Sequence, residues 1–150
     1  MTDEEAMRRA LDIASAAEAS GDVPVGAVVL DQSGAVIGEG VNVRERDRDP
    51  TGHAEMVALR AAADSLGRWR LDNCRLIVTL EPCTMCAGAI VLSRVERLVF
   101  AAIDEKAGAV GSLWDVVRDR RLNHRPEVIS GVAADESSAL LRRFFAERRG

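Results

Sequence analysis

The sequence has few of the residues and patterns that mark secreted or membrane-spanning proteins. Only three of its 150 residues are cysteine, and this small, odd number favours metal or thiol chemistry in a reducing compartment over disulfides. No apolar run approaches the roughly 20 residues needed to cross a bilayer. The acidic, polar start, residues 1–5, does not have the pattern of a secretory signal. We therefore expect a cytoplasmic protein with no membrane segment.

An excess of positive charge is also missing. The net charge is -4, which is the wrong sign for a simple nucleic-acid binder. The charge is uneven, because residues 118–150 carry eight arginines against five acids, so this segment is +3 and the rest is -7. Solvated helices often carry many arginines, but a local basic surface could still meet phosphates.

The length and composition are those of one globular domain. Apolar residues make up 47% of the chain and charged residues 29%, both ordinary values for a soluble domain with its own core. We find no internal repeat, low-complexity tract or linker. We therefore expect a single domain over residues 1–150, with no extra domain implied.

Hydrophobic periodicity predicts alternating helices and strands. Thr2 and Glu5 have the form of a capping box at the start of a helix that Gly21 stops. Further helices are predicted over residues 53–66, 82–93, 113–118 and 137–148, and strands over residues 25–30, 35–41, 75–80, 97–102 and 127–132. This order predicts an α/β fold with three α/β/α layers around a central mixed sheet of about five strands.

Two short motifs carry the strongest chemical signal. His53-Ala54-Glu55 begins one predicted helix, and Pro82-Cys83-Thr84-Met85-Cys86 begins another thirty residues later. Cys83 and Cys86 are three residues apart and share a helix face, and a helix N-terminus favours thiolates. If the two helix starts face each other, His53 and both cysteines can bind one zinc ion.

The predicted zinc ion has an open fourth position. A strand over residues 75–80 would separate Cys74 from the metal by about 20 Å at roughly 3.3 Å per residue, and His124 cannot be placed. Water is the natural occupant, and zinc lowers the pKa of bound water from about 16 toward 7. On an ideal helix Glu55 points roughly 200° away from His53, but beside the helix start it could carry protons without binding the metal.

The two motifs resemble the signature of the cytidine deaminase superfamily. Longer matches resemble its tRNA-specific adenosine deaminases, and they cover residues 53–60, 79–100, 104–114, 123–125 and 144–145. The resemblance implies a cytidine-deaminase-like fold with one Zn²⁺ per subunit. It also implies hydrolytic deamination of adenosine to inosine at the wobble position of a tRNA anticodon, with an arginine-type anticodon as the expected substrate, by a homodimer whose subunits both shape the substrate cleft.

The same resemblance implies roles for individual residues. His53, Cys83 and Cys86 would hold zinc, and Glu55 would deprotonate the water and then protonate the base and the leaving ammonia. Asn42 would contact the flipped nucleoside. Contacts to neighbouring nucleotides or to the anticodon loop are implied for six further residues: Asp104, Lys106, Asn123, Phe144, Phe145 and Arg148.

Simpler interpretations stay open at this point. Phe144 and Phe145 have helical spacing from apolar neighbours, so at least one is expected in the core. Asn42 and Asn123 could be ordinary turn residues, and Lys106 a solvated loop residue. The metal motif equally permits a deaminase of a free base or nucleotide, of guanine or cytidine type. A zinc-stabilised binding module without catalysis is the third alternative.

Overall fold

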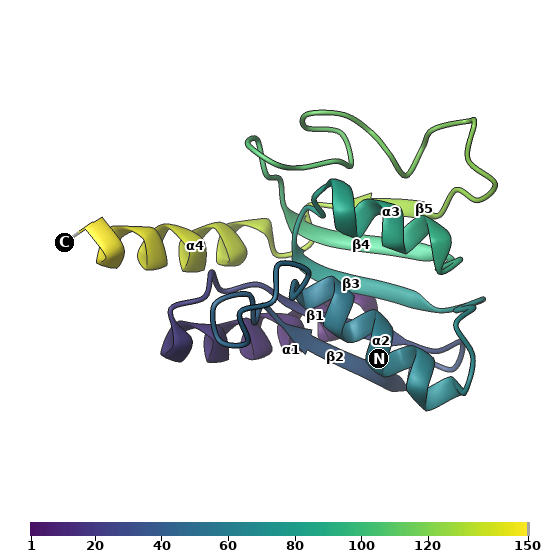
Figure 1. Ribbon diagram of the computed structural model, residues 1–150, viewed down its shortest axis with the longest axis horizontal. Helices are drawn as coiled ribbons and strands as arrows, with labels where there is room; N and C mark the ends of the chain where they lie inside the picture. The colour runs from purple at the N-terminus through teal and green to yellow at the C-terminus, as the bar shows by residue number, and fades with distance from the viewer. Residues whose placement is uncertain (150) are drawn as a thin grey trace.

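A mixed sheet forms the centre of the molecule (Figure 1). The computed structural model describes residues 1–149. Its strands are β1 (Gly26–Leu30), β2 (Val36–Val41), β3 (Arg75–Leu80), β4 (Arg97–Ala102) and β5 (Glu127–Ser130). The strand order is β2-β1-β3-β4-β5, with β1 antiparallel to both of its neighbours and β3, β4 and β5 parallel. The predicted mixed sheet of about five strands is confirmed.

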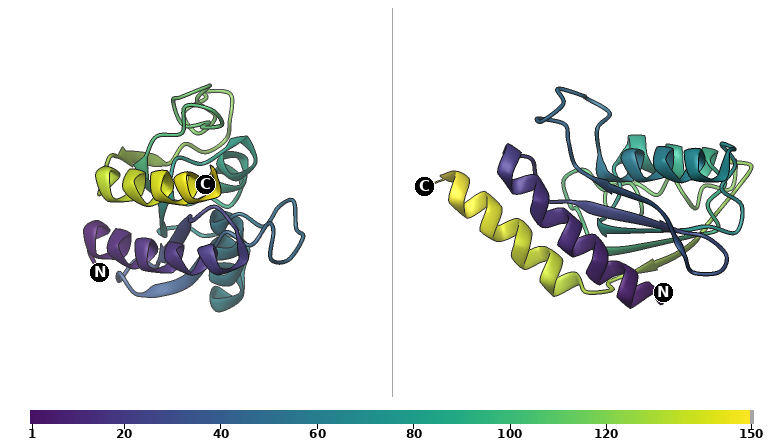
Figure 2. Two further views of the ribbon diagram at one scale, coloured as in Figure 1. Left: turned by 90° about the vertical axis from the view of Figure 1, so that its left-hand side faces the viewer. Right: turned by 90° about the horizontal axis from the view of Figure 1, so that it is seen from below.

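Helices cover both faces of this sheet. They are α1 (Asp3–Ser15), α2 (Ala54–Leu66), α3 (Thr84–Leu92) and α4 (Ala134–Arg149), and a short 3₁₀ helix (Ala16–Ser20) follows α1. Figure 2 shows α1 and α4 side by side on one face of the sheet, with α2 and α3 on the other. The three-layer α/β/α prediction is therefore confirmed. Among the described residues, no helix is both long enough and apolar enough to span a membrane.

Side chains alternate along the central strands and build an apolar layer on each face. Val29 and Val78 belong to the cluster under α2 and α3, whereas Val28 and Ile77 belong to the cluster under α1. Successive residues of a strand point to opposite faces. Because both faces are covered, these strands are continuous apolar runs rather than alternating ones. The buried strands give a rigid base for the residues at their ends.

Close packing of α2 on β2 places the start of α2. A Cβ atom at Gly40 would overlap the carbonyl oxygen of Ala54, so glycine is required for this approach of helix to strand. The first residues of α2 therefore lie directly over the end of β2.

The predicted helix over residues 113–118 is wrong. Val110 and Asp115 form an isolated antiparallel bridge, and the N–H of Gly111 donates to the carbonyl of Trp114 at 2.9 Å. The backbone groups of this segment pair across a turn, so they are not available for bonds between residues four apart.

The last helix begins three residues earlier than predicted, at Ala134. Ser137, the predicted start, lies inside α4, and its hydroxyl donates to the carbonyl of Thr79 at 2.5 Å. The sequence pattern predicted that the polar Ser137 begins the helix. In the structure its hydroxyl instead connects α4 to β3.

Candidate metal centre and substrate cavity

Several chain segments meet at one edge of the sheet and line a cavity of about 550 Å³. Because β1 is antiparallel to β2 and β3, its first residues meet the last residues of β2, β3 and β4 at this edge. The approach to β1, the start of α2, the segments after β2, β3 and β4, and α4 all contribute. Apolar side chains from three of these segments form much of the wall: Val23, Val25, Ile103, Leu141 and Phe145. Such a cavity, mostly apolar with a few polar groups, is typical of a small-molecule or nucleobase site.

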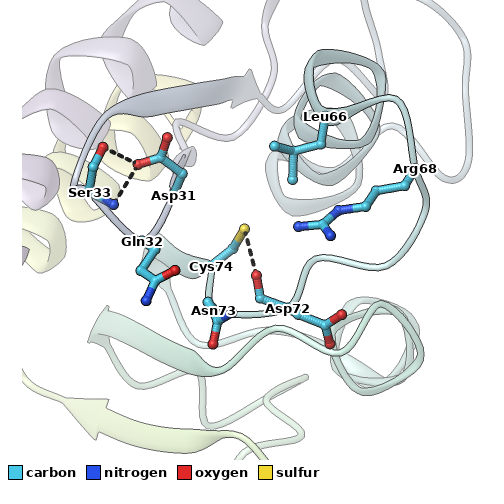
Figure 3. A pocket seen from close by; sticks show the side chains of 8 residues that line it. All are labelled: Asp31, Gln32, Ser33, Leu66, Arg68, Asp72, Asn73 and Cys74. Atoms are coloured by element: carbon cyan, nitrogen blue, oxygen red, sulfur yellow. Dashed lines mark hydrogen bonds between the residues drawn. The ribbon is translucent and has the colours of Figure 1, made fainter.

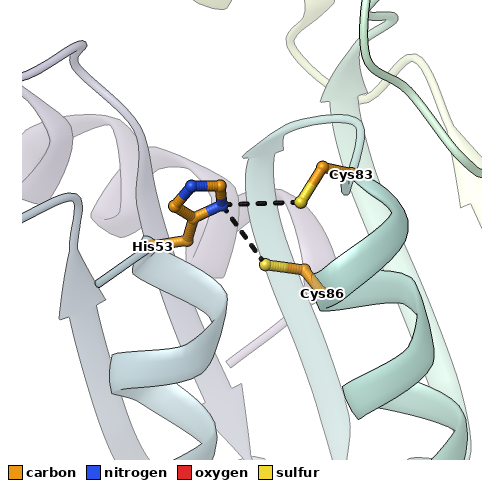
Figure 4. Close-up of side chains that lie close together, drawn as sticks. All are labelled: His53, Cys83 and Cys86. Atoms are coloured by element: carbon orange, nitrogen blue, oxygen red, sulfur yellow. Dashed lines mark hydrogen bonds between the residues drawn. The ribbon is translucent and has the colours of Figure 1, made fainter. Parts of the chain in front are cut away.

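His53, Cys83 and Cys86 converge beside this cavity (Figure 4). The Nδ1 atom of His53 lies 3.5 Å from Sγ of Cys83 and 3.5 Å from Sγ of Cys86. Zinc with tetrahedral geometry and ordinary bond lengths holds nitrogen and sulfur about 3.6 Å apart. The three ligand atoms lie within 4.8 Å of one another, and no other such group occurs among the described residues. The donor set therefore fits zinc in both chemistry and spacing.

The ligands are held at two helix starts that face each other. His53 is the N-cap of α2, and Cys83 is the N-cap of α3, with Cys86 in the first turn. The predicted helix start at Pro82 is two residues early. The carbonyl of Pro82 instead accepts the N–H of Ala109 at 2.8 Å, so this residue belongs to the connection with a neighbouring loop.

The thiols of Cys83 and Cys86 shift each other's pKa values in opposite directions. A hydrogen bond from Cys86 lowers the pKa of Cys83 to about 4, against the opposing effect of burial and with a further contribution from His53. The same bond, together with burial, raises the pKa of Cys86 far above its ordinary value. A divalent ion binds both cysteines as thiolates, so metal binding is expected to release protons.

Glu55 lies beside the cluster without being one of its ligands. It is 4% exposed, lines the cavity and follows His53 at the start of α2. Burial raises the pKa of Glu55 to about 7, which suits a group that exchanges protons near neutral pH. His53 precedes the helix in an extended conformation (φ -79°, ψ 153°). The opposite directions expected of two residues within a helix therefore do not apply, and both side chains reach the cavity.

Residues 1–102 match the family model of the cytidine and deoxycytidylate deaminase zinc-binding region. The chain belongs to this deaminase family. The deaminase is therefore a hydrolytic enzyme with zinc as its cofactor, and the cluster of His53, Cys83 and Cys86 is positioned to hold the ion.

Relatives of the deaminase match it over nearly its whole length. The tRNA-specific adenosine deaminase of Haemophilus influenzae is 53% identical over 147 residues, which are 98% of this chain and 85% of the relative. A solved structure from a study of A-to-I editing by tRNA:A34 deaminases has a TM-score of 0.87 and 42% identity, covering 91% of this chain and 99% of the other. A guanine deaminase from Nitrosomonas europaea has a TM-score of 0.80 and 31% identity, covering 95% and 84%. The same fold thus serves deaminases of different bases.

Four of the residues expected to contact RNA line the cavity of the deaminase: Asn42, Asp104, Lys106 and Phe145. Nδ2 of Asn42 donates to the carbonyl of Val23, and its Oδ1 accepts the N–H of Arg44. Oδ1 of Asp104 accepts the N–H of Lys106. Asn42 and Asp104 therefore shape their own loops as well as facing the cavity.

The two phenylalanines of α4 have different environments. Phe144 is 4% exposed and packs in the core, whereas Phe145 is 45% exposed and lines the cavity. Their rings meet edge to face with centroids 5.2 Å apart. The guanidinium carbon of Arg148 lies 4.5 Å from the centroid of the Phe144 ring, a cation–π contact that holds this arginine at the end of α4. The expectation that at least one phenylalanine is core is confirmed, and Phe145 is the one available to a substrate.

The structure does not bring Asn123 to the cavity. Nε2 of the adjacent His124 lies 2.6 Å from the carbonyl oxygen of Val95, which precedes β4 at the opposite edge of the sheet. The length of β4 separates this point from Asp104 by about 20 Å at roughly 3.3 Å per residue. Within one subunit, Asn123 and Asp104 therefore cannot contact the same nucleotide, and His124 serves to attach its loop to the sheet.

Cys74 lies at the opposite edge from the metal cluster, as expected. It is buried and borders a second, smaller hollow of about 260 Å³ with Asp31, Arg68 and Asp72 (Figure 3). Its thiol donates to the carbonyl of Asp72 at 3.5 Å. Cys74 is therefore not a metal ligand within this chain.

Several residues of the cavity were not predicted from the sequence, among them Glu81 and Ile103. Ile103 is 61% exposed directly after the buried strand β4, and an apolar residue in that place is only a weak signal. Glu81 is 3% exposed, and its hydrogen-bond partners lie 23 to 31 residues further along the chain. No local pattern reveals a contact of that range.

Proposed function

We propose that this deaminase converts adenosine to inosine at the wobble position of a tRNA anticodon, with an arginine-type anticodon as its substrate. The observation that carries the proposal is the 53% identity, over 98% of the chain, to a tRNA-specific adenosine deaminase. A tRNA substrate also implies that the enzyme acts in the cytoplasm.

The residues around the cavity can carry out hydrolytic removal of an amino group. His53, Cys83 and Cys86 would hold zinc, which when bound supplies Lewis-acid activation of water. Glu55 can accept a proton from a water molecule in the cavity on a carboxylate oxygen and return it to the ring nitrogen of the base as the oxygen bonds to C6. It then takes the remaining proton of the former water from the hydroxyl on C6 and gives it to the amino group, which leaves as ammonia when the C6–N bond breaks. Water and adenosine are thereby converted to inosine and ammonia.

The walls of the cavity suit a base that has left its stack. Ile103, Leu141 and Phe145 present apolar surface to a planar ring, and flipped bases are held between apolar or aromatic side chains of this kind. Arg44 and Lys106 lie at the same cavity and carry the positive charge that attracts phosphates. The acidic Asp104 and Glu105 lie at the same cavity, so Arg44 and Lys106 offer individual phosphate contacts and not a basic surface.

Inosine formation in a short RNA tests the substrate assignment. An anticodon stem-loop of arginine type, with adenosine at the wobble position, is incubated with zinc-loaded protein, digested to nucleosides and analysed by mass spectrometry. We expect inosine to replace adenosine at that position and not in a control RNA whose only loop adenosine lies elsewhere. Deamination of free guanine or cytidine without inosine in the RNA would favour the free-base alternative, for which the likeness to a guanine deaminase is the supporting observation.

The proposal includes a homodimer formed through the outer face of α3. This helix, TMCAGAIVL, is apolar on all sides, and a helix of that kind is ordinarily buried all round. Yet Leu92 is 69% exposed, and a Cβ atom added at Gly88, one turn earlier, would meet nothing. Trp114, 55% exposed, extends this surface through its Nε1–H bond to Thr84 at the start of α3. We propose that a second copy of the chain covers this surface, which would allow both subunits to shape the substrate cleft.

Replacing Leu92 with aspartate is expected to convert the dimer into a monomer. A charge at this position would be desolvated in the interface without a partner, which costs more than the contact stabilises. Light scattering after size exclusion gives the mass directly. Val36→Asp, at an exposed apolar residue of β2, is the matched control and should remain dimeric. A monomeric wild type, or a dimeric Leu92→Asp variant, would contradict this interface.

A further inference from the structure

A buried carboxylate next to the metal ligands holds the loop that follows β4. Glu81 comes directly after β3, two residues before Cys83, and is 3% exposed. Its Oε1 accepts the N–H of Asp104 at 3.0 Å and the hydroxyl of Ser112 at 2.5 Å. Its Oε2 accepts the N–H of Val110 at 2.9 Å and the N–H of Ser112 at 3.1 Å. One side chain thus binds both ends of the segment 104–112.

These four bonds use the full capacity of the carboxylate. Two ionised oxygens offer about four acceptor positions, and all four are filled by donors from the loop. Backbone N–H dipoles take the place of a cation around the charge, and hydrogen bonds to a charged acceptor are roughly twice as strong as neutral ones. Glu81 therefore has no oxygen left for a proton-transfer role like that of Glu55.

The same loop lies directly against the segment that carries Cys83. Gly108 and Cys83 form an isolated antiparallel bridge, and the N–H of Ala109 donates to the carbonyl of Pro82 at 2.8 Å. A Cβ atom at Gly108 would collide with the carboxylate of Glu81. The approach is so close that glycine is needed, and Glu81 is the side chain around which the loop is built.

The loop contributes two side chains to the cavity, so its position affects what a substrate meets there. Asp104 and Lys106 line the cavity, and the N–H of Asp104 is one of the groups that Glu81 holds. Oδ1 of Asp104 in turn accepts the N–H groups of Lys106 and Ala107. A chain of hydrogen bonds therefore runs from Glu81 to the residues that face an incoming substrate.

We propose that Glu81 is a positioning residue, whose carboxylate holds the segment 104–112 against Cys83 so that this loop contacts the nucleotides beside the reacting base. This inference rests on the proposed tRNA function. Glu81 acts through the loop and not on the reacting atoms. Its loss is therefore expected to weaken substrate binding much more than the chemical step.

The variant Glu81→Gln tests this role because glutamine keeps the shape of the side chain. It replaces one acceptor oxygen by an NH₂ group, which cannot accept the N–H and O–H donors of the loop. We expect KM for the anticodon stem-loop to rise by about tenfold or more, the factor that corresponds to losing one hydrogen bond to a charged group. We expect kcat to change by less than about threefold, because Glu55 and the ligands are untouched. Zinc content should stay the same as in the wild type.

Amide hydrogen exchange gives a second measurement that needs no substrate. In the wild type the N–H groups of Asp104, Val110 and Ser112 should be protected by their bonds to Glu81. In Glu81→Gln they should exchange faster, while amides within β3 and α3 keep their protection. Val99→Ala, in the core on the opposite face of the sheet, is the control, since it should lower the melting temperature without changing loop exchange or KM.

The outcomes separate the two proposals. A wild-type protein that forms no inosine overturns the tRNA function, while the exchange of the three amides still reports whether Glu81 holds the loop. Unchanged KM and exchange in Glu81→Gln, or a loss of kcat at unchanged KM, overturns the positioning role. If Glu81→Gln does not fold, Ser112→Ala removes one donor only and should raise KM by about threefold, and an unchanged KM in that variant also overturns it.

Discussion

Replacing Glu55 with glutamine is expected to abolish deamination and to leave zinc binding intact. Glutamine has nearly the same shape but cannot take a proton from water or deliver one to the base. General acid–base catalysis contributes about 10²- to 10⁴-fold for one transfer, and Glu55 is assigned more than one, so kcat should fall by at least about a thousandfold. Glu55 lies outside the cluster of ligand atoms, so the metal should remain. Turnover on the stem-loop and zinc content by elemental analysis, measured on one preparation, check both statements.

Glu39→Gln is the matched control for this experiment. Glu39 pairs with Arg9 on the surface at 2.5 Å, and exposed pairs of this kind contribute only about 0–1 kcal/mol, so activity should not change. Normal turnover in Glu55→Gln would leave the zinc-stabilised binding module as the better interpretation. Loss of zinc in that variant would instead make Glu55 a ligand.

Replacing Cys86 with serine is expected to remove zinc and activity together. Cys86 is fully buried in the first turn of α3, and a serine hydroxyl does not ionise to replace its thiolate. Mutation of outer partners already weakens metal binding by about 10- to 100-fold, so loss of a ligand should exceed about 100-fold. The zinc content of Cys86→Ser is measured with a chromogenic chelator. Its turnover is then measured with and without added zinc.

Cys74→Ser makes the same chemical change at the other edge of the sheet. Cys74 is also buried, so the two variants carry a similar cost of placing a hydroxyl in the core. Zinc content and turnover should match the wild type in Cys74→Ser, and treatment of the wild type with a chelator should reproduce the Cys86→Ser result. A zinc-free Cys74→Ser protein would show that the three-ligand assignment is wrong.

Local patterns were enough for most of the secondary structure. The β-branched run over residues 75–80 is β3, because a strand covered on both faces needs apolar residues at every position. The capping box of Thr2 and Glu5 opens α1 as predicted, because its bonds lie within one turn. The prediction of a helix over residues 113–118 was wrong because the backbone of this segment pairs with residues 109–111. That pairing depends on the neighbouring loop.

The residues of the candidate site also fall into those that local motifs predict and those that only the tertiary structure reveals. The sequence by itself was enough to predict the candidate metal ligands, because His53, Cys83 and Cys86 occur in two short motifs whose helix starts need only face each other, and the structure brings the three together. Only the tertiary structure showed that Phe145 faces the cavity while Phe144 packs in the core, and that Asn123 lies away from Asp104. It alone revealed Glu81, whose partners are up to 31 residues away. Hydrogen bonds of that range form only after the strands have brought their ends to one edge of the sheet, so no local pattern can encode them.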